Sequence, residues 1–173
     1  MTGGVVPGLE LVDAPGGDDR RGWMRRFFDA ESGSGLAPDL VPHQVAVAHN
    51  RQRGTLRGLH LQSQPFPDAK LVSCVRGRIF DVIVDLRPGS EAYGTWQSVE
   101  LAADRPQTLS VPAGCAHGYL TLDDESDVLY VIGAPYRPEL QSGVRWDDPT
   151  LAIAWPFAPS VISDRDLALP YLP

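Results

Sequence analysis

Short apolar runs alternate along the chain with turns rich in glycine and proline. The runs contain many β-branched and aromatic residues, and 16 prolines and 17 glycines leave little room for long helices. One short helix is expected, from Phe27 to Leu36, and the stretch from Trp155 to Pro173 is expected to lie as irregular chain across the domain. Strands are predicted near 43–49, 55–62, 70–75, 78–86, 95–101, 107–111, 117–122 and 127–133.

The regular spacing of these strands favours a sandwich or barrel over alternating strands and helices. A length of 173 residues suits one domain, so residues 1–173 are taken as a single unit. The turn 112–118 delivers a histidine to the start of a strand, as in ligand-binding barrels of the cupin class. The predicted fold is therefore all-β, a cupin-like jelly roll with few short helices.

One hairpin is predicted in detail. Arg76-Gly77 is read as a two-residue turn that pairs Val72 with Asp81 and makes Lys70 a diagonal neighbour of Asp81. Two interpretations remain open for these charges. Either Lys70 lines a pocket and Asp81 orients it, or the two form a salt bridge on a solvated face.

The strand that carries His60 poses a geometric problem. A regular strand points Arg57 and His60 to opposite faces, because their numbers differ by three. Gly58 lies between them, and glycine inside a strand often marks a bulge. We therefore expect an extra residue at Gly58 to bring Arg57 and His60 into one cavity.

Composition narrows the class of partner and the compartment. A net charge of −7 argues against nucleic acid or an anionic membrane as the main partner. The chain has no apolar run long enough to span a membrane and no signal peptide at its start, so a cytoplasmic location is expected. Cys74 and Cys115 lack CxxC spacing and are interpreted as buried thiols in a reducing compartment.

The histidines favour acid–base chemistry over metal binding. A mononuclear cupin site generally uses a His-x-His pair, whereas this strand offers only Leu59-His60-Leu61, and His43 and His49 lie elsewhere. No metal is predicted. An imidazole ordinarily titrates near neutral pH, which suits His60 as a general base.

Several motifs occur in order along the chain: Arg57-Gly58-Leu59-His60, Lys70-Leu71-Val72, Gly77-Arg78-Ile79-Phe80-Asp81-Val82, Val84-Asp85-Leu86-Arg87, the segment 111–118, Val144-Arg145-Trp146-Asp147-Asp148-Pro149 and Ile162-Ser163-Asp164-Arg165-Asp166. Together they resemble the dTDP-4-dehydrorhamnose 3,5-epimerase family, over about Asp19 to Leu172. The resemblance implies a cupin-like jelly roll that needs no cofactor, forms a homodimer, and acts on a nucleoside-diphosphate-linked 4-keto-6-deoxyhexose, commonly the dTDP-linked sugar.

The same resemblance implies catalytic roles. His60 removes a proton beside the ketone and is oriented by Asp166, with Asp164 as the weaker candidate. Tyr130 reprotonates the opposite face, and Tyr136 is the alternative donor. Lys70 stabilises the developing oxyanion.

Substrate-binding positions follow in the same way. Arg57, Arg21 and His117 match substrate-binding positions of the family, and guanidinium groups suit a diphosphate. Further contacts are expected from Arg26, Gln44, Asn50 and Arg165.

The segment 44–51 and Leu61 depart from the commonest pattern of the family, which leaves the nucleotide base and the sugar open. Two other functions stay open. One is a single-centre epimerase or keto-isomerase of a deoxysugar pathway. The other is a non-catalytic cupin that binds a sugar nucleotide or a metal.

Overall fold

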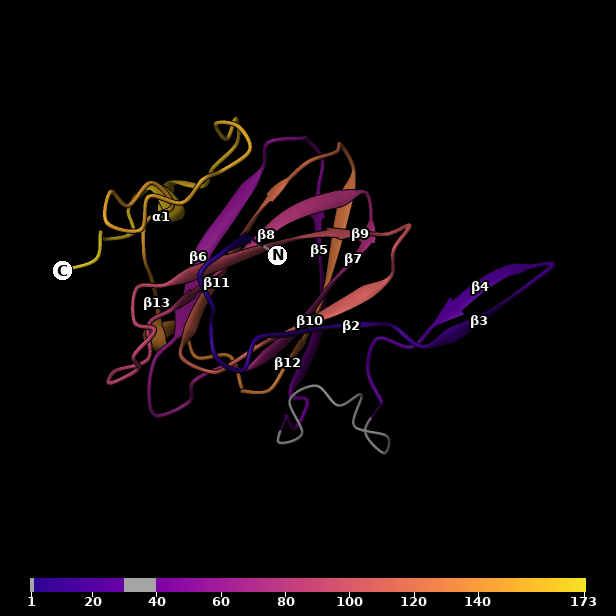
Figure 1. Ribbon diagram of the computed structural model, residues 1–173, viewed down its shortest axis with the longest axis horizontal. Coiled ribbons are helices and arrows are strands. Elements are labelled where there is room, and N and C mark those ends of the chain that lie inside the picture. Colours follow the sequence, from indigo (N-terminus) through magenta and orange to yellow (C-terminus); the bar gives the residue numbers. More distant parts are fainter. Residues whose placement is uncertain (1, 30–39) are drawn as a thin grey trace.

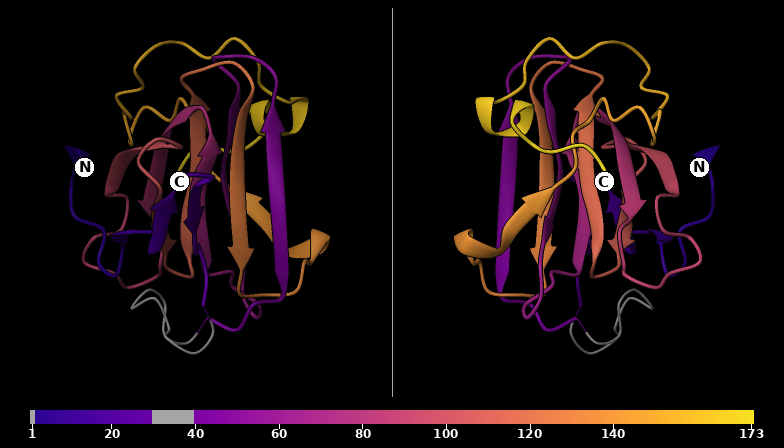
Figure 2. Two further views of the ribbon diagram at one scale, coloured as in Figure 1. Left: turned by 90° about the vertical axis from the view of Figure 1, so that its right-hand side faces the viewer. Right: turned by 90° about the vertical axis from the view of Figure 1, so that its left-hand side faces the viewer.

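Two antiparallel sheets lie face to face and enclose the core in the computed structural model, which describes residues 2–29 and 40–173 (Figures 1 and 2). The six-stranded sheet has the order β1 (Thr2–Gly3), β9 (Trp96–Ala102), β8 (Arg78–Asp85), β11 (Cys115–Thr121), β6 (Leu56–Gln62) and β13 (Gln141–Gly143). The five-stranded sheet has the order β2 (Glu10–Asp13), β10 (Gln107–Val111), β7 (Lys70–Arg76), β12 (Ser126–Ile132) and β5 (Gln44–Asn50).

The strand pattern predicted from the sequence is confirmed. Each of the eight predicted strands has a counterpart among β5 to β12, with ends that differ by at most two residues. The fold is the expected cupin-like jelly roll, all-β with little helix. Strands β1 to β4 and β13 were not predicted, because they are short and carry weak alternation.

The helix predictions fared less well. Residues 27–29 are not helical, and the rest of the predicted helix, 30–36, lies outside the described residues. The stretch after Trp155 contains a short helix, α1 (Asp164–Leu167), within otherwise irregular chain. Its start is marked by Ser163, whose side chain accepts a hydrogen bond from the backbone N–H of Asp166.

The predicted hairpin at Arg76-Gly77 is wrong. Strand β7 pairs with β10 and β12, whereas β8 pairs with β9 and β11, so the connection crosses from one sheet to the other. A tight hairpin turn of the favoured I′ type needs positive φ at both central residues, and only Gly77 has it, with φ of 72°. Lys70 and Asp81 therefore lie on opposite sheets and are not cross-strand neighbours.

Within the described residues the core has two main parts and a third, smaller cluster around Leu71 and Val131. The larger part fills the space between the sheets and includes Val72, Leu109, Ile83 and Leu101, all buried. The second main part lies where the C-terminal segment packs on strands of the six-stranded sheet, with Trp155 against Leu59 and its neighbours. This packing fixes the C-terminal segment against β6.

Two features lie at the periphery. The strands β3 (Gly16–Asp19) and β4 (Gly22–Arg25) pair with each other and form an arm that extends away from the sheets (Figure 1). Strand β5 is an edge strand, and its outer face carries Val45 and Val47, which are 68% and 58% exposed. None of the described helices is long and apolar enough to cross a membrane.

Both cysteines are buried and unpaired, as expected. Burial raises the pKa of the Cys74 thiol to about 12 and that of Cys115 to about 11. Both thiols therefore stay protonated near neutral pH.

Candidate active site

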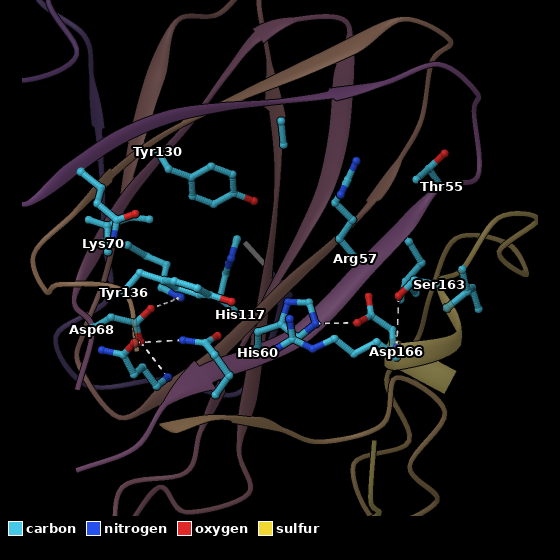
Figure 3. Close-up of a pocket in the computed structure, with 18 of the residues that line it drawn as sticks. Thr55, Arg57, His60, Asp68, Lys70, His117, Tyr130, Tyr136, Ser163 and Asp166 are labelled. Atoms are coloured by element: carbon cyan, nitrogen blue, oxygen red, sulfur yellow. Dashed lines mark hydrogen bonds and ion pairs between the residues drawn. The ribbon is translucent and has the colours of Figure 1, made fainter. Parts of the chain in front are cut away.

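A cavity of about 550 Å³ opens between the two sheets beside α1 (Figure 3). Its size is in the range of small-molecule sites. Its walls come from both sheets, from the loop before β7 and from the C-terminal segment. The polar lining residues are Gln44, Thr55, Arg57, His60, Gln62, Asp68, Lys70, His117, Tyr130, Tyr136, Gln141, Ser163, Arg165 and Asp166.

The bulge predicted at Gly58 is present. Strand β11 pairs His117 with His60 and Tyr119 with Arg57. Gly118 of β11 therefore lies opposite two residues of β6, Gly58 and Leu59. Gly58 has φ of 124°, and a Cβ there would lie 2.5 Å from the Cα of Gly118. As expected, Arg57 and His60 both line the cavity.

His60 and Asp166 form a close pair at the cavity wall. The Nε2 atom of His60 lies 2.6 Å from Oδ1 of Asp166, and the side chains are 30% and 5% exposed (Figure 3). A carboxylate can only accept, so Nε2 carries the proton and Nδ1 is left as the basic nitrogen. Asp166, and not Asp164, is therefore placed to orient His60.

Two further groups hold the charge of Asp166. The backbone N–H of Gly58 donates to Oδ2 at 3.1 Å, and the side chain of Ser163 lies in hydrogen-bonding contact. Burial acts to raise the pKa of Asp166, but the hydrogen bonds and charge of His60, with Gly58 and Ser163, lower it overall. The low pKa favours the ionised carboxylate although the side chain is buried.

Tyr130 faces the same cavity from the opposite sheet. Its ring packs edge-on against the ring of His117, with centroids 5.9 Å apart (Figure 3). Burial, reinforced by the neighbouring Tyr119 and Asp81, raises the pKa of Tyr130 well above its ordinary value. Its hydroxyl therefore carries a proton at neutral pH. Tyr136, the alternative donor, also lines the cavity but is 54% exposed.

Lys70 lies deep in the cavity, but its partner is Asp68 and not Asp81. The ammonium nitrogen is 2.9 Å from Oδ2 of Asp68. Asp68 also accepts a hydrogen bond from the backbone N–H of Gln62 at 2.9 Å, which fixes the loop before β7. Sequence reasoning missed Asp68, although its place two residues before Lys70 in a proline-bounded loop was a usable signal.

Asp81 orients His117 instead of Lys70. Its two oxygens lie 2.8 and 3.0 Å from Nε2 of His117, and both side chains are buried. Burial raises the pKa of Asp81, and the opposing effects of His117 and Lys70 do not overcome it. The predicted pairing of Asp81 with Lys70 is therefore wrong, since Asp81 pairs with His117 and Lys70 with Asp68.

The predicted substrate-binding residues divide into two groups. Arg57, Gln44, His117 and Arg165 line the cavity. Asn50 does not line this cavity; it is buried and accepts a hydrogen bond from Nε of Arg57 at 2.8 Å, and its contact with substrate stays a prediction.

The other group lies outside the cavity. Arg21 sits in the arm with its side chain 90% exposed and ion-paired to Asp19, and Arg26 pairs with Asp29. Neither arginine lines the cavity of its own chain, so their contact with substrate stays a prediction. In the described residues, no group of three or more His, Cys, Asp or Glu side chains is placed to hold a metal ion.

These groups can abstract and return protons beside a carbonyl. The cavity has a basic imidazole on one sheet, a protonated phenol on the other, and an ammonium group between the loop and β7. The sequence profile described as dTDP-4-dehydrorhamnose 3,5-epimerase matches residues 5–173. The chain belongs to the dTDP-4-dehydrorhamnose 3,5-epimerase family.

Individual members of this epimerase family are similar over nearly the whole chain. The dTDP-4-dehydrorhamnose 3,5-epimerase of Sinorhizobium fredii is 48% identical over 155 residues, covering 89% of this chain and 80% of the relative. The enzyme of Bacillus anthracis, solved with TDP and PPi bound, has a TM-score of 0.92 and 35% identity over 97% of each chain. ChmJ of Streptomyces bikiniensis, a 3'-monoepimerase solved with dTDP-quinovose, has a TM-score of 0.89 and 34% identity over 99% of this chain and 87% of its own.

Proposed function

We propose that this protein is an isomerase that epimerises a nucleoside-diphosphate-linked 4-keto-6-deoxyhexose, inverting C3, C5 or both. The dTDP-linked sugar is the proposed substrate, in keeping with the names of the relatives. The observation that carries the proposal is the cavity with His60–Asp166 on one side and Tyr130 on the other. Inversion needs a base on one face of a carbon and an acid on the other.

The proposed reaction begins at His60. Its Nδ1 takes the proton from the carbon beside the ketone, the C–H electrons form the enolate double bond, and the carbonyl oxygen becomes negative. Asp166 holds the resulting imidazolium, a role typical of such carboxylates. Lys70 stabilises the enolate oxygen, an interaction worth several kcal/mol in a dry site.

Tyr130 completes the inversion. The enolate carbon takes the phenolic proton on the face opposite His60, the Tyr130 O–H bond breaks, and the ketone is restored. The raised pKa of Tyr130 keeps the donor protonated until it is needed. No cofactor enters this scheme.

The diphosphate is proposed to bind at the open side of the cavity. Arg57 and Arg165 supply guanidinium donors there, while Gln44 and His117 line the wall nearer the sugar. Asn50 contributes by holding Arg57.

A second candidate is a single-centre epimerase. ChmJ, a 3'-monoepimerase, is about as similar in structure as the two-centre enzymes. A keto-isomerase would differ in which carbons exchange, and a non-catalytic cupin would exchange none.

Proton NMR of the substrate in deuterated buffer separates these functions. A two-centre epimerase exchanges the hydrogens at C3 and C5, and a single-centre enzyme exchanges one of them. The absence of exchange at either position, with the nucleotide sugar bound, would replace the proposed enzyme by a binding protein.

We further propose a homodimer in which the arm completes the partner's cavity. The arm carries Arg21, which does not line the cavity of its own chain, and the outer face of β5 leaves Val45 and Val47 exposed. Exposed apolar side chains on an edge strand suit a second copy.

We also propose a cytoplasmic location, where reducing conditions suit the two unpaired thiols.

Mixing two inactive variants tests the shared site. Arg21→Ala and His60→Ala chains, refolded together, should regain activity if one intact cavity forms from the two chains. The oligomeric state is checked by light scattering, and recovery no greater than in the unmixed variants would show that Arg21 does not act in the partner's cavity.

A further inference from the structure

One carboxylate of the cavity has no part in the proposed proton transfers. Asp68 lines the cavity, and its Oδ2 atom lies 2.9 Å from the ammonium nitrogen of Lys70. The side chains of Asp68 and Lys70 are only 12% and 8% exposed. Figure 3 shows the two residues at the side of the cavity away from Asp166. Among the described residues, Asp68 is the one carboxylate that forms an ion pair with Lys70.

A buried ammonium group needs such a partner. Loss of water disfavours the charged form of an amine, and an opposite charge a few ångströms away favours it. The proposed role of Lys70 depends on the charged form, because a neutral amine stabilises an enolate oxygen far less. An ammonium group has three N–H donors, so pairing with one carboxylate leaves donors for a substrate oxygen. The lysine side chain is also flexible, and a fixed partner restricts it to one position.

Asp68 is itself held in place by the end of β6. Its Oδ1 atom accepts a hydrogen bond from the backbone N–H of Gln62 at 2.9 Å. The buried side chain of Gln62 donates to the carbonyl oxygens of Phe66 at 2.5 Å and Pro135 at 3.0 Å. Its Oε1 atom accepts from the backbone N–H of Arg137 at 2.8 Å. These bonds hold the loop between β6 and β7, and with it the carboxylate of Asp68, against β6.

We propose that Asp68 is a positioning residue that acts through Lys70. It keeps the ammonium group charged and directed at the oxygen that becomes negative in the enolate. Asp68 exchanges no proton with the substrate. The inference rests on the proposed epimerase function. It predicts that loss of the Asp68 charge slows formation of the enolate and leaves nucleotide binding nearly unchanged.

Asp68→Asn tests this role, because it removes the charge and keeps the size of the side chain. Deuterium exchange beside the ketone at saturating substrate should slow by about 10- to 100-fold, the effect of one interaction with a charged group. KM and the affinity for dTDP should change by less than about threefold, since the lost interaction belongs to the transition state. Asp123→Asn is the matched control, because it breaks an ion pair with Arg78 that lies at the surface outside the cavity.

A double variant separates this role from a general structural one. If Asp68 acts only through Lys70, adding Asp68→Asn to Lys70→Met should slow exchange by no more than about twofold further. The double variant lacks the ammonium group that Asp68→Asn leaves unpaired, so this comparison stands even where the single variant does not fold.

Three results would overturn the inference. They are multiplicative losses in the double variant, an Asp68→Asn variant that exchanges at the wild-type rate, and a loss confined to the affinity for dTDP. Wild-type protein without any exchange would instead remove the proposed function, and this inference with it.

Discussion

The two histidine–aspartate pairs use the same chemical groups in opposite surroundings. His60–Asp166 lies at the cavity wall, where Gly58 and Ser163 add hydrogen bonds to the carboxylate. His117–Asp81 lies in the interior, where burial dominates. The pKa of Asp166 is lowered and that of Asp81 is raised.

The difference shows that the donors around a carboxylate decide what its histidine can do. Asp166 keeps its charge and can hold an imidazolium during turnover. Burial raises the pKa of Asp81, so its charged form is less favoured than that of Asp166. Of the two histidines that line the cavity, His60 is therefore the proposed base.

Replacing the histidines gives the largest expected contrast. His60→Ala should lower deuterium exchange beside the ketone by about 10² to 10⁴-fold, because it removes the proposed base. Nucleotide binding should persist, as measured by calorimetry with dTDP. His43→Ala, on an exposed histidine outside the cavity, is the control. An exchanging His60→Ala variant would assign the base elsewhere.

Replacing Asp166 should slow exchange more than replacing Asp81. Asp166→Asn should reduce the exchange rate by about 10²-fold, since the amide can no longer orient and stabilise the imidazolium. Asp81→Asn should reduce it by less than about tenfold, the order of one hydrogen bond. The exchange rates are measured by NMR at saturating substrate. Equal losses of rate in the two variants would show that the two pairs do not differ in function.

Stability should rank the pairs in the reverse order. Asp81→Ala should lower the free energy of unfolding by about 3 kcal/mol, because it leaves His117 buried without a partner. Asp166→Ala should cost about 1 kcal/mol, since His60 can reach solvent. Urea unfolding measures both. An Asp81→Leu, His117→Leu double variant should recover most of the loss, and failure to do so would point to packing.

The smallest effect is a difference in pH dependence. The folded pKa of Asp166 is lowered, so its contribution to stability is present above its unfolded value near 3.8 and is lost as pH falls through the folded value. The pKa of Asp81 in the folded state is raised. Its contribution to stability is therefore present below the unfolded pKa and is lost as pH rises through the folded pKa. The free energy of unfolding is measured from pH 3 to 8. Asp166→Asn should remove a rise of stability with pH, and Asp81→Asn should remove a fall of stability with pH.

The sequence was most informative where the physics is local. The alternation of apolar residues located the eight central strands, and Gly58 between Arg57 and His60 predicted the bulge. Strand pairing depends on contacts distant in sequence, so the Arg76-Gly77 connection was misread as a hairpin. The same error gave Lys70 the wrong carboxylate.

The site itself was less accessible to local reasoning. His60 and Asp166 are 106 positions apart, and only the family resemblance joined them in advance. The pattern Ser163-x-x-Asp166 marks a helix start, but there the acidic side chain would be expected to turn back to its own helix. In the fold it reaches β6 instead, which periodicity could not show.

The surplus residue at Gly58 has a consequence for transplanting this chemistry. The register of β6 shifts at Gly58. Arg57 and His60 therefore line one cavity, although a regular strand would point them to opposite faces. The freed N–H of Gly58 also binds Asp166. A designer who grafts this site onto another jelly roll must therefore carry the irregular segment whole, because deleting a single amino acid would turn the Arg57 side chain away from the cavity.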